Sequence, residues 1–339
     1  MKRYVMLAAA ALVLAAPAAR AQGTVSVLCS VQLEWCQAVS AEFTRLTGIR
    51  VAMVNKGSGE TFAQLKAEAA NPKTDLWFGG TGDPHLQAAE ENLTEVYKSP
   101  RMGDLHPWAV KQAEDSGFKT VGIYAGALGF GYNPELGKKK NIALPKCWSD
   151  LLNPALKGDI QVANPASSGT AYTMIATLVQ VMGEDKAFDY MKRLHPNIGA
   201  YTRSGVAPIK AAARGETLVS ISFIHDGVTE AKAGFPMATA TPCEGTGYEV
   251  GSISIVKGAR NLDAARKMVD WALSVEGQSH MPKAGAFQVP SNRNAPLPPE
   301  APKLSEIKLI AYDFKKYGSS AERRRLLDKW EKEVNSLPR

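Results

Sequence analysis

The sequence TVSVLCSVQLEWCQAVSAEFTRLTGIRVAMVNKGSGETFAQLKAEAANPKTDLWFGG, residues 24–80, decides the fold class of this 339-residue chain. The spacing of its apolar residues alternates between that of strands and that of helices. The predicted order is strand 24–28, helix 35–47, strand 49–54, helix 60–70 and strand 75–78. Two strands joined through a helix normally lie parallel in one sheet. This order therefore predicts βαβ units and an α/β fold.

Similar patterns continue along the chain and predict a second α/β unit over roughly residues 125–245. Its expected elements are strand 121–132, short helix 147–152, strand 160–163, a helix ending at Met182, helix 185–194, helix 208–214 and strand 217–223. We divide the chain into lobe 1 (22–124), lobe 2 (125–245), a return to lobe 1 (246–300) and C-terminal helices packing on the lobes (301–339).

Two glycine-rich strands, at 121–132 and 245–256, are placed to connect the lobes. A hinge of a few strand-terminal residues is what closure of a cleft requires, so we favour two hinge crossings. The alternative is that both are ordinary strands of one large sheet.

Residues 1–21 have the pattern of a secretory signal peptide. Lys2 and Arg3 precede an apolar run at 5–16, and Ala19-Arg20-Ala21 provides a small-x-small cleavage site after Ala21. The run is too short to cross a bilayer as a helix, which disfavours the alternative of a membrane anchor. We therefore expect a periplasmic protein that does not span the membrane.

Charge and cysteine content narrow the possible partners. Without the three basic residues of the signal segment, 37 basic side chains stand against 33 acidic ones, a net charge of +4. They form no basic stripe with interleaved aromatics, so no nucleic-acid partner is expected. Four cysteines in an exported protein predict two disulfides. Of three connectivities we favour Cys29–Cys36 and Cys147–Cys243, which close a short loop and tie distant segments.

Catalytic and metal-binding signatures are missing from the sequence. There is no G-x-S-x-G and no H-E-x-x-H motif. The glycines at 245–251 are misplaced for a dinucleotide loop and precede a strand. The cysteines lack C-x-x-C spacing and the five histidines are scattered. We expect no catalytic residue, no cofactor and no resident metal.

Three glycine- and hydroxyl-rich segments begin predicted helices and are candidates for anion binding. The free N–H groups and positive dipole end of a helix N-terminus favour phosphate, sulfate or carboxylate. The alternatives are ordinary N-caps and turns. The candidate residues are Ser58, Gly59, Glu60 and Thr61 in the first segment, Gly80 and Thr81 in the second, and Ser167, Ser168, Gly169 and Thr170 in the third.

A second kind of candidate combines an imidazole with carboxylates. His225 and Asp226 follow the apolar strand at 217–223, and Glu249 lies in a glycine-flanked strand. Polar groups at the carboxyl ends of strands often line a ligand cleft, and carboxylates there accept sugar hydroxyls or a cationic group. The alternative is a structural pair satisfied by loop backbone, with Glu249 in a salt bridge.

Taken in order, the motifs resemble the extracellular solute-binding proteins of ABC importers, in the branch grouped with the ferric-ion-binding proteins. The resemblance rests on 57–60, 75–80, 167–170, 222–226 and 243–249. It implies a two-lobed type II periplasmic binding protein fold, with two mixed sheets flanked by helices. It also implies a monomer that captures a small anionic ligand and delivers it to an inner-membrane ABC permease.

The resemblance also points to a ligand class. Ferric-ion binders of the branch use adjacent tyrosines, whereas Tyr172, Tyr190, Tyr201 and Tyr248 are isolated here. The His-Asp pair and the downstream Glu249 resemble sugar-phosphate and organophosphonate binders, which implies that these three contact the sugar or amine while the serine-rich segments hold the phosphoryl group. Ferric ion and thiamine or its phosphates remain alternatives. A remote one is a secreted hydrolase using Ser168 with His225 and Asp226.

Overall fold

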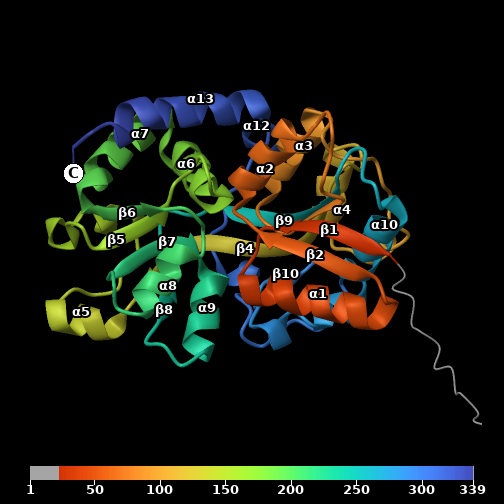
Figure 1. The fold of residues 1–339 in the computed structure, drawn as a ribbon. Coiled ribbons are helices and arrows are strands. Elements are labelled where there is room, and N and C mark those ends of the chain that lie inside the picture. The colour runs from red at the N-terminus through yellow and green to blue at the C-terminus, as the bar shows by residue number, and fades with distance from the viewer. Residues whose placement is uncertain (1–22, 339) are drawn as a thin grey trace, which may run out of the picture.

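The computed structural model describes residues 23–338, so the predicted signal peptide and its cleavage site lie outside the described residues. Within them, ten strands are hydrogen-bonded together (Figure 1). Eight follow the order β2-β1-β3-β9-β4-β7-β5-β6, and β10 and β8 pair with β4 beside this path. The strands are β1 (Thr24–Cys29), β2 (Arg50–Asn55), β3 (Leu76–Phe78), β4 (Val121–Tyr132), β5 (Ile160–Ala163), β6 (Ile198–Thr202), β7 (Val219–Phe223), β8 (Ala238–Ala240), β9 (Tyr248–Ile255) and β10 (Val289–Pro290).

The long strand β4 joins two mixed sheets. Its first half pairs antiparallel with β9 and β10, and its second half pairs antiparallel with β7 and β8. The parallel strand pairs predicted from residues 24–80 are present. Strand β1 lies between β2 and β3 and pairs in parallel with both. A second parallel set has β5 between β6 and β7. The α/β class with two mixed sheets is confirmed, and the two sheets share β4 rather than being separate.

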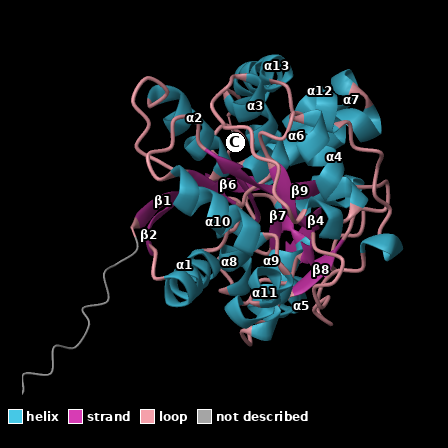
Figure 2. Ribbon diagram, turned by 90° about the vertical axis from the view of Figure 1, so that its right-hand side faces the viewer, coloured by secondary structure: helices cyan, strands magenta, loops and turns pink. Residues whose placement is uncertain are grey.

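Helices cover both faces of the sheets (Figures 1 and 2). In chain order they are α1 (Leu33–Thr47), α2 (Ser58–Ala67), α3 (Gly82–Glu90), α4 (Pro107–Asp115), α5 (Pro134–Lys140), α6 (Gly169–Met182), α7 (Glu184–Leu194), α8 (Ala207–Ala213), α9 (Ile224–Lys232), α10 (Leu262–Ala272), α11 (Val275–Ser279), α12 (Phe314–Tyr317) and α13 (Ser320–Trp330). The predicted helix at 147–152 is a 3₁₀ helix at Trp148–Leu152.

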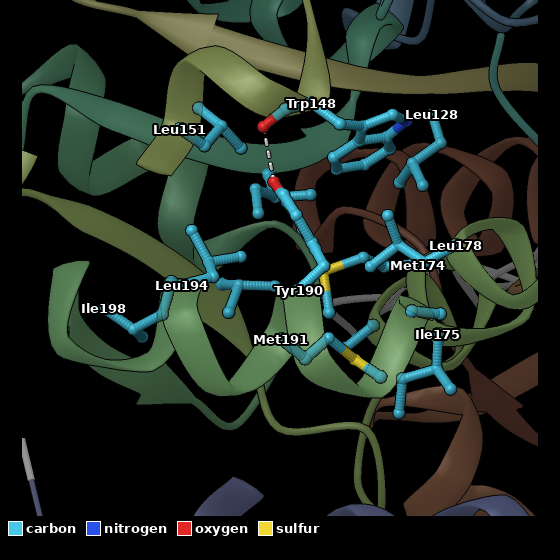
Figure 3. Packing of buried hydrophobic residues seen from close by; sticks show 14 of the residues in the cluster. Leu128, Trp148, Leu151, Met174, Ile175, Leu178, Tyr190, Met191, Leu194 and Ile198 are labelled. Atoms are coloured by element: carbon cyan, nitrogen blue, oxygen red, sulfur yellow. Dashed lines mark hydrogen bonds between the residues drawn. The ribbon is translucent and has the colours of Figure 1, made fainter. Parts of the chain in front are cut away.

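The two largest hydrophobic cores of the described residues are separate and define the lobes, and a smaller third cluster around Trp77 also belongs to lobe 1. The core of lobe 1 includes Trp35 and Phe43 from the apolar face of α1, packed under β1, β3 and β9. The core of lobe 2 gathers β5, β7, α6 and α7, and Figure 3 shows its packing around Tyr190. The Tyr190 hydroxyl donates to the Trp148 carbonyl at 2.6 Å, so the buried polar atom is satisfied. The division into two cores explains why one continuous sheet still belongs to two lobes.

The C-terminal segment makes a further connection between the lobes. After β10 the chain returns along residues 302–313, where Leu309 bridges to Thr246 beside the crossing into β9. Helix α13 then lies over α6 and α7 (Figure 1), with Leu326 and Trp330 buried in the core of lobe 2. The sequence predicts these helices but leaves open which lobe holds them.

Both predicted disulfides are present. Cys29 pairs with Cys36 and Cys147 pairs with Cys243. The second bond joins the start of the 3₁₀ helix to the segment that leaves lobe 2. None of the helices in residues 23–338 is long and apolar enough to cross a membrane.

A candidate ligand-binding cavity between the lobes

The carboxyl ends of both parallel strand sets meet where the lobes face each other. In lobe 1 the segments after β1, β2 and β3 reach this seam, and in lobe 2 those after β5, β6 and β7 do so. Ligands of open α/β sheets bind beyond the carboxyl ends of the strands. A cavity of about 70 Å³ lies at this place, and every one of the six segments contributes to its lining.

Eight of the thirteen predicted site residues line this cavity. They are Ser58, Gly80, Thr81, Ser168, Thr170, His225, Asp226 and Glu249. A larger hollow of about 1040 Å³ lies on lobe 2 beside Leu144, Leu152 and Tyr190. That hollow is lined by lobe 2 alone, whereas the interlobe cavity gathers hydroxyl, imidazole and carboxyl groups from both lobes. We therefore take the interlobe cavity as the candidate site.

One part of the lining consists of hydroxyl groups at helix N-termini. Thr81 is the N-cap residue of α3 and Ser168 that of α6, and each is 2% exposed. Ser58 is the first residue of α2. The Oγ1 atom of Thr81 is buried and has no hydrogen-bond partner within residues 23–338. The positive N-terminal ends of α3 and α6 and several hydroxyl donors thus converge on one place, an arrangement that favours an anion.

The other part of the lining is an imidazole between two carboxylates. His225 Nε2 lies 3.6 Å from Asp226 Oδ1 and 3.7 Å from Glu249 Oε1. His225 and Asp226 stand in the first turn of α9, not in a loop after the strand. Gly126 of β4 lies directly against the His225 ring. A Cβ atom at this position would collide with His225 Nδ1. This contact gives a reason for one glycine of the glycine-rich strand.

Burial changes the charges of this cluster. It raises the pKa of Asp226 to about 7, against the opposing effect of a hydrogen bond donated by Gln32 Nε2. Burial raises the pKa of Glu249 well above its usual range, and the charges of Asp226 and Asp83 add to the effect. Burial lowers the pKa of His225 to about 3. The imidazole is therefore neutral at pH 7, and the carboxyl groups hold protons far more readily than exposed ones.

Five predicted site residues lie outside the cavity lining, and contact between the lobes accounts for Gly59 and Glu60. Gly59 and Glu60 donate their backbone N–H groups to the Ser167 carbonyl at 3.1 and 3.3 Å. The Glu60 side chain pairs with Arg203 of lobe 2. The Ser167 hydroxyl bonds to the Arg203 carbonyl at 2.8 Å, so it faces the loop rather than the cavity.

The remaining two of these five lie behind the lining. The Thr61 hydroxyl bonds to Ser30 Oγ at 3.1 Å. Gly169 packs against Thr81, so that a side chain at this position would collide with the Thr81 hydroxyl. These residues support the cavity wall instead of lining it.

Several lining residues were not predicted. Gln32, Tyr124 and Gln288 line the cavity, as does Lys56, whose Nζ donates to Gln64 at 2.7 Å. The Tyr124 hydroxyl accepts from the Gly80 N–H at 3.1 Å and thereby links the two parts of the lining. Gln32 and Lys56 follow predicted strands, so the carboxyl-end rule identifies their positions. Tyr124 lies inside a strand, and no local signal marks it.

With fold and cavity described, the class of protein follows. Residues 71–316 match the family of bacterial extracellular solute-binding proteins, and this chain belongs to that family. A protein of Haemophilus influenzae without an assigned function is 46% identical over 93% of this chain and 92% of its own. A relative from Salmonella typhimurium, whose name proposes 2-aminoethylphosphonate binding in the periplasm, is 26% identical over 73% of this chain and 71% of its own.

The solved structures agree on the fold. The periplasmic binding protein AfuA from Actinobacillus pleuropneumoniae, solved with exogenous fructose 6-phosphate, is 48% identical with a TM-score of 0.90 and covers 93% of this chain and 100% of its own. The periplasmic binding protein P5PA is 41% identical with a TM-score of 0.88, over 92% and 100%. Iron-bound HitA from Pseudomonas aeruginosa is 20% identical with a TM-score of 0.73, over 90% and 98%, and supports the fold alone.

Proposed function

We propose that this chain is the periplasmic solute-binding component of an ABC importer and that it captures a sugar phosphate between its lobes. The observation that carries the proposal is the composition of the interlobe cavity. Helix N-termini with hydroxyl donors meet a cluster of imidazole, carboxyl, amide and phenol groups there. The 48% identity to a binding protein solved with fructose 6-phosphate supports the same ligand class.

The phosphoryl group is assigned to Ser58, Thr81, Ser168 and Thr170. A phosphate monoester carries up to two negative charges and accepts several hydrogen bonds. Hydroxyl donors at helix N-termini satisfy these acceptors, and the aligned peptide dipoles favour the negative charge. Burial between the lobes strengthens each such bond relative to water.

The sugar is assigned to His225, Asp226 and Glu249. Sugar hydroxyls both donate and accept, and this cluster offers both kinds of partner. The neutral imidazole offers Nε2 as donor or acceptor according to its tautomer, the Gln32 amide donates, and the carboxyl oxygens accept. A sugar phosphate therefore finds partners for both its halves in one cavity.

The geometry disfavours hydrolysis by Ser168. In a serine triad the carboxylate orients the imidazole from Nδ1 and leaves Nε2 for the serine. Here both carboxylates approach Nε2, while Nδ1 is buried against Gly126 and lacks a hydrogen-bond partner among the described residues. We accordingly propose binding and release without a chemical step, by a monomer that delivers its ligand to an inner-membrane permease.

Titration calorimetry on the mature chain, after unfolding and refolding to remove copurified ligand, tests the assignment. We expect fructose 6-phosphate to bind at least tenfold more tightly than fructose or inorganic phosphate alone, because each fragment leaves half of the cavity groups unpaired. 2-Aminoethylphosphonate, thiamine phosphate and ferric citrate complete the panel. Tightest binding of any of these three would overturn the sugar-phosphate proposal. Phosphorus NMR of the ligand recovered after release checks that the protein has not hydrolysed it.

A further inference from the structure

A buried guanidinium lies behind the cavity. Arg323 comes from α13 on lobe 2 and is 5% exposed. Its Nη2 donates to the carbonyls of Pro165 and Ala166 at 3.2 and 3.3 Å, and its Cζ lies 4.7 Å from the ring centre of Tyr172. Arg323 does not line the cavity. Burying a charged group costs free energy, so a buried guanidinium needs hydrogen bonds or charged partners that offset this cost.

The loop that Arg323 holds is the one that reaches the other lobe. The next carbonyl along, that of Ser167, accepts both N–H groups that Gly59 and Glu60 offer from the first turn of α2. The following residue, Ser168, caps α6 and lines the cavity. Arg323 thus fixes two carbonyls of this loop, and lobe 1 engages the third.

Lobe 1 approaches the guanidinium closely through Gly59. A Cβ atom there would collide with the Ala166 carbonyl and would lie 3.0 Å from Arg323 Nη2. The bare backbone of α2 therefore packs on the Arg323 side of the seam. Because Gly59 and Arg323 belong to different lobes, the contact forms only when the lobes are together.

A buried carboxyl of lobe 1 faces the same charge. Asp83, in the first turn of α3, accepts from the Tyr312 hydroxyl at 3.2 Å. Burial raises its pKa to about 7, while the Tyr312 hydrogen bond and the positive charge of Arg323 oppose that shift. Oδ1 of Asp83 and Nη1 of Arg323 both lack a hydrogen-bond partner in the part of the chain described. The two lobes thus share one buried polar cluster at the seam.

We propose that Arg323 is a positioning residue for ligand capture. It aligns loop 165–168 so that the Ser167 carbonyl caps α2 of lobe 1, and it stabilises the closed form without touching the ligand. The inference rests on the proposed function only in the choice of fructose 6-phosphate as the probe.

Arg323→Met tests the proposal, with Arg323→Lys as the conservative variant. Methionine keeps an unbranched apolar stem in place of the arginine stem and loses both hydrogen bonds to the loop. We expect the Kd for fructose 6-phosphate to rise about tenfold, as is typical for coupled sites, through faster dissociation. Lysine should restore part of the loss. Arg325→Met is the matched control, because Arg325 pairs with Glu184 and Glu322 on the exposed side of the same helix.

Gly59→Ala tests the other side of the seam and keeps the proposal testable if Arg323→Met folds poorly. Alanine favours a helix more than glycine does, so lobe 1 of the variant should still fold, which circular dichroism of the ligand-free protein checks. Dissociation of fructose 6-phosphate should nevertheless accelerate about tenfold, because the added methyl group obstructs closure. Wild-type dissociation rates in both Arg323→Met and Gly59→Ala would overturn the proposal.

Hydrogen exchange of the Gly59 and Glu60 amides separates this inference from the proposed function. These amides belong to lobe 1 but bond to the Ser167 carbonyl of lobe 2. Exchange in the core of lobe 2 is therefore followed in the same experiment, and unchanged exchange there shows that lobe 2 itself is still folded. We expect faster exchange of the two amides in Arg323→Met than in the wild type or Arg325→Met, with and without ligand. If the wild type binds no fructose 6-phosphate, the proposed function fails. The inference about Arg323 is judged separately, because equal exchange of these amides in the ligand-free wild type and Arg323→Met would refute it.

Discussion

Asp226 shows how burial changes the chemistry of one side chain. The residue type suggests a carboxylate at neutral pH, but Asp226 is 4% exposed and its pKa is raised to about 7. The nearby Glu249 has its pKa raised as well, chiefly by burial. Sequence indicates which groups are present, and only the surroundings decide which of them hold a proton.

This shift predicts a pH dependence of stability. The unfolded pKa of aspartate is about 3.9, so the folded protein binds more protons than the unfolded chain between about pH 4 and 7. The contribution of Asp226 to the free energy of unfolding should therefore fall as the pH rises through this range. Urea unfolding at several pH values should show a smaller decline in Asp226→Asn. Asp328→Asn, at an exposed position of α13, should keep the wild-type slope.

Gly59 shows the limit of interpreting single residues. A glycine at the start of a helix indicates that something approaches the backbone closely. From sequence we interpret the approaching group as a ligand, whereas in the structure it is the carbonyl of Ala166 from the other lobe. Close approach of a ligand and close approach of the other lobe both need a residue without a side chain. A glycine in the sequence therefore does not show which of the two approaches it.

At the scale of elements, the helix starts carry most of the candidate site. The sequence predicts helices after Gly59 and Gly169, and the structure begins them at Ser58 and Gly169. It does not predict β6 and β8, which are short and half-exposed and so have a weak period-two pattern. It also misses α9 altogether, because the apolar strand before it continues into the helix without a turn signal.

The start of α6 predicts a contrast between adjacent serines. Ser168 lines the cavity, while the Ser167 hydroxyl bonds to backbone carbonyls of its own lobe. A hydrogen bond to a charged group contributes about 1.5–3 kcal/mol, so Ser168→Ala should weaken binding of fructose 6-phosphate about 10- to 100-fold. Ser167→Ala should leave the affinity unchanged. Calorimetry on the pair checks both, and equal affinities would remove Ser168 from the phosphoryl site.

At the scale of the whole molecule, β4 and the C-terminal segment determine how the lobes are joined. The sequence leaves a choice between a hinge and one large sheet. In the structure the hydrogen bonds run continuously through β4 while the cores stay separate on either side of it. Residues 302–313 add a further connection, and α13 places Arg323 at the seam.

The two disulfides should contribute unequally to stability. Cys29 and Cys36 are 7 residues apart, whereas Cys147 and Cys243 are 96 apart. Loop-closure entropy predicts that losing the longer cross-link costs about 4–5 kcal/mol and losing the shorter one about 2–3 kcal/mol. Chemical denaturation of the two double-serine variants measures both. A larger loss for Cys29 and Cys36 would mean that native-state contacts outweigh chain entropy.

What the sequence determines by itself is what local spacing encodes. It specifies the α/β class, most of the helices and strands and their parallel order, and the residue types of the candidate site, because periodicity, turn residues and helix caps act over a few neighbours. The tertiary structure decided which residues face the cavity and which face the other lobe. It also decided the charges of the buried acids and the meeting of Arg323 with Gly59, 264 residues away along the chain. These depend on the packing of two lobes against each other, and no local pattern encodes a distance between segments so far apart.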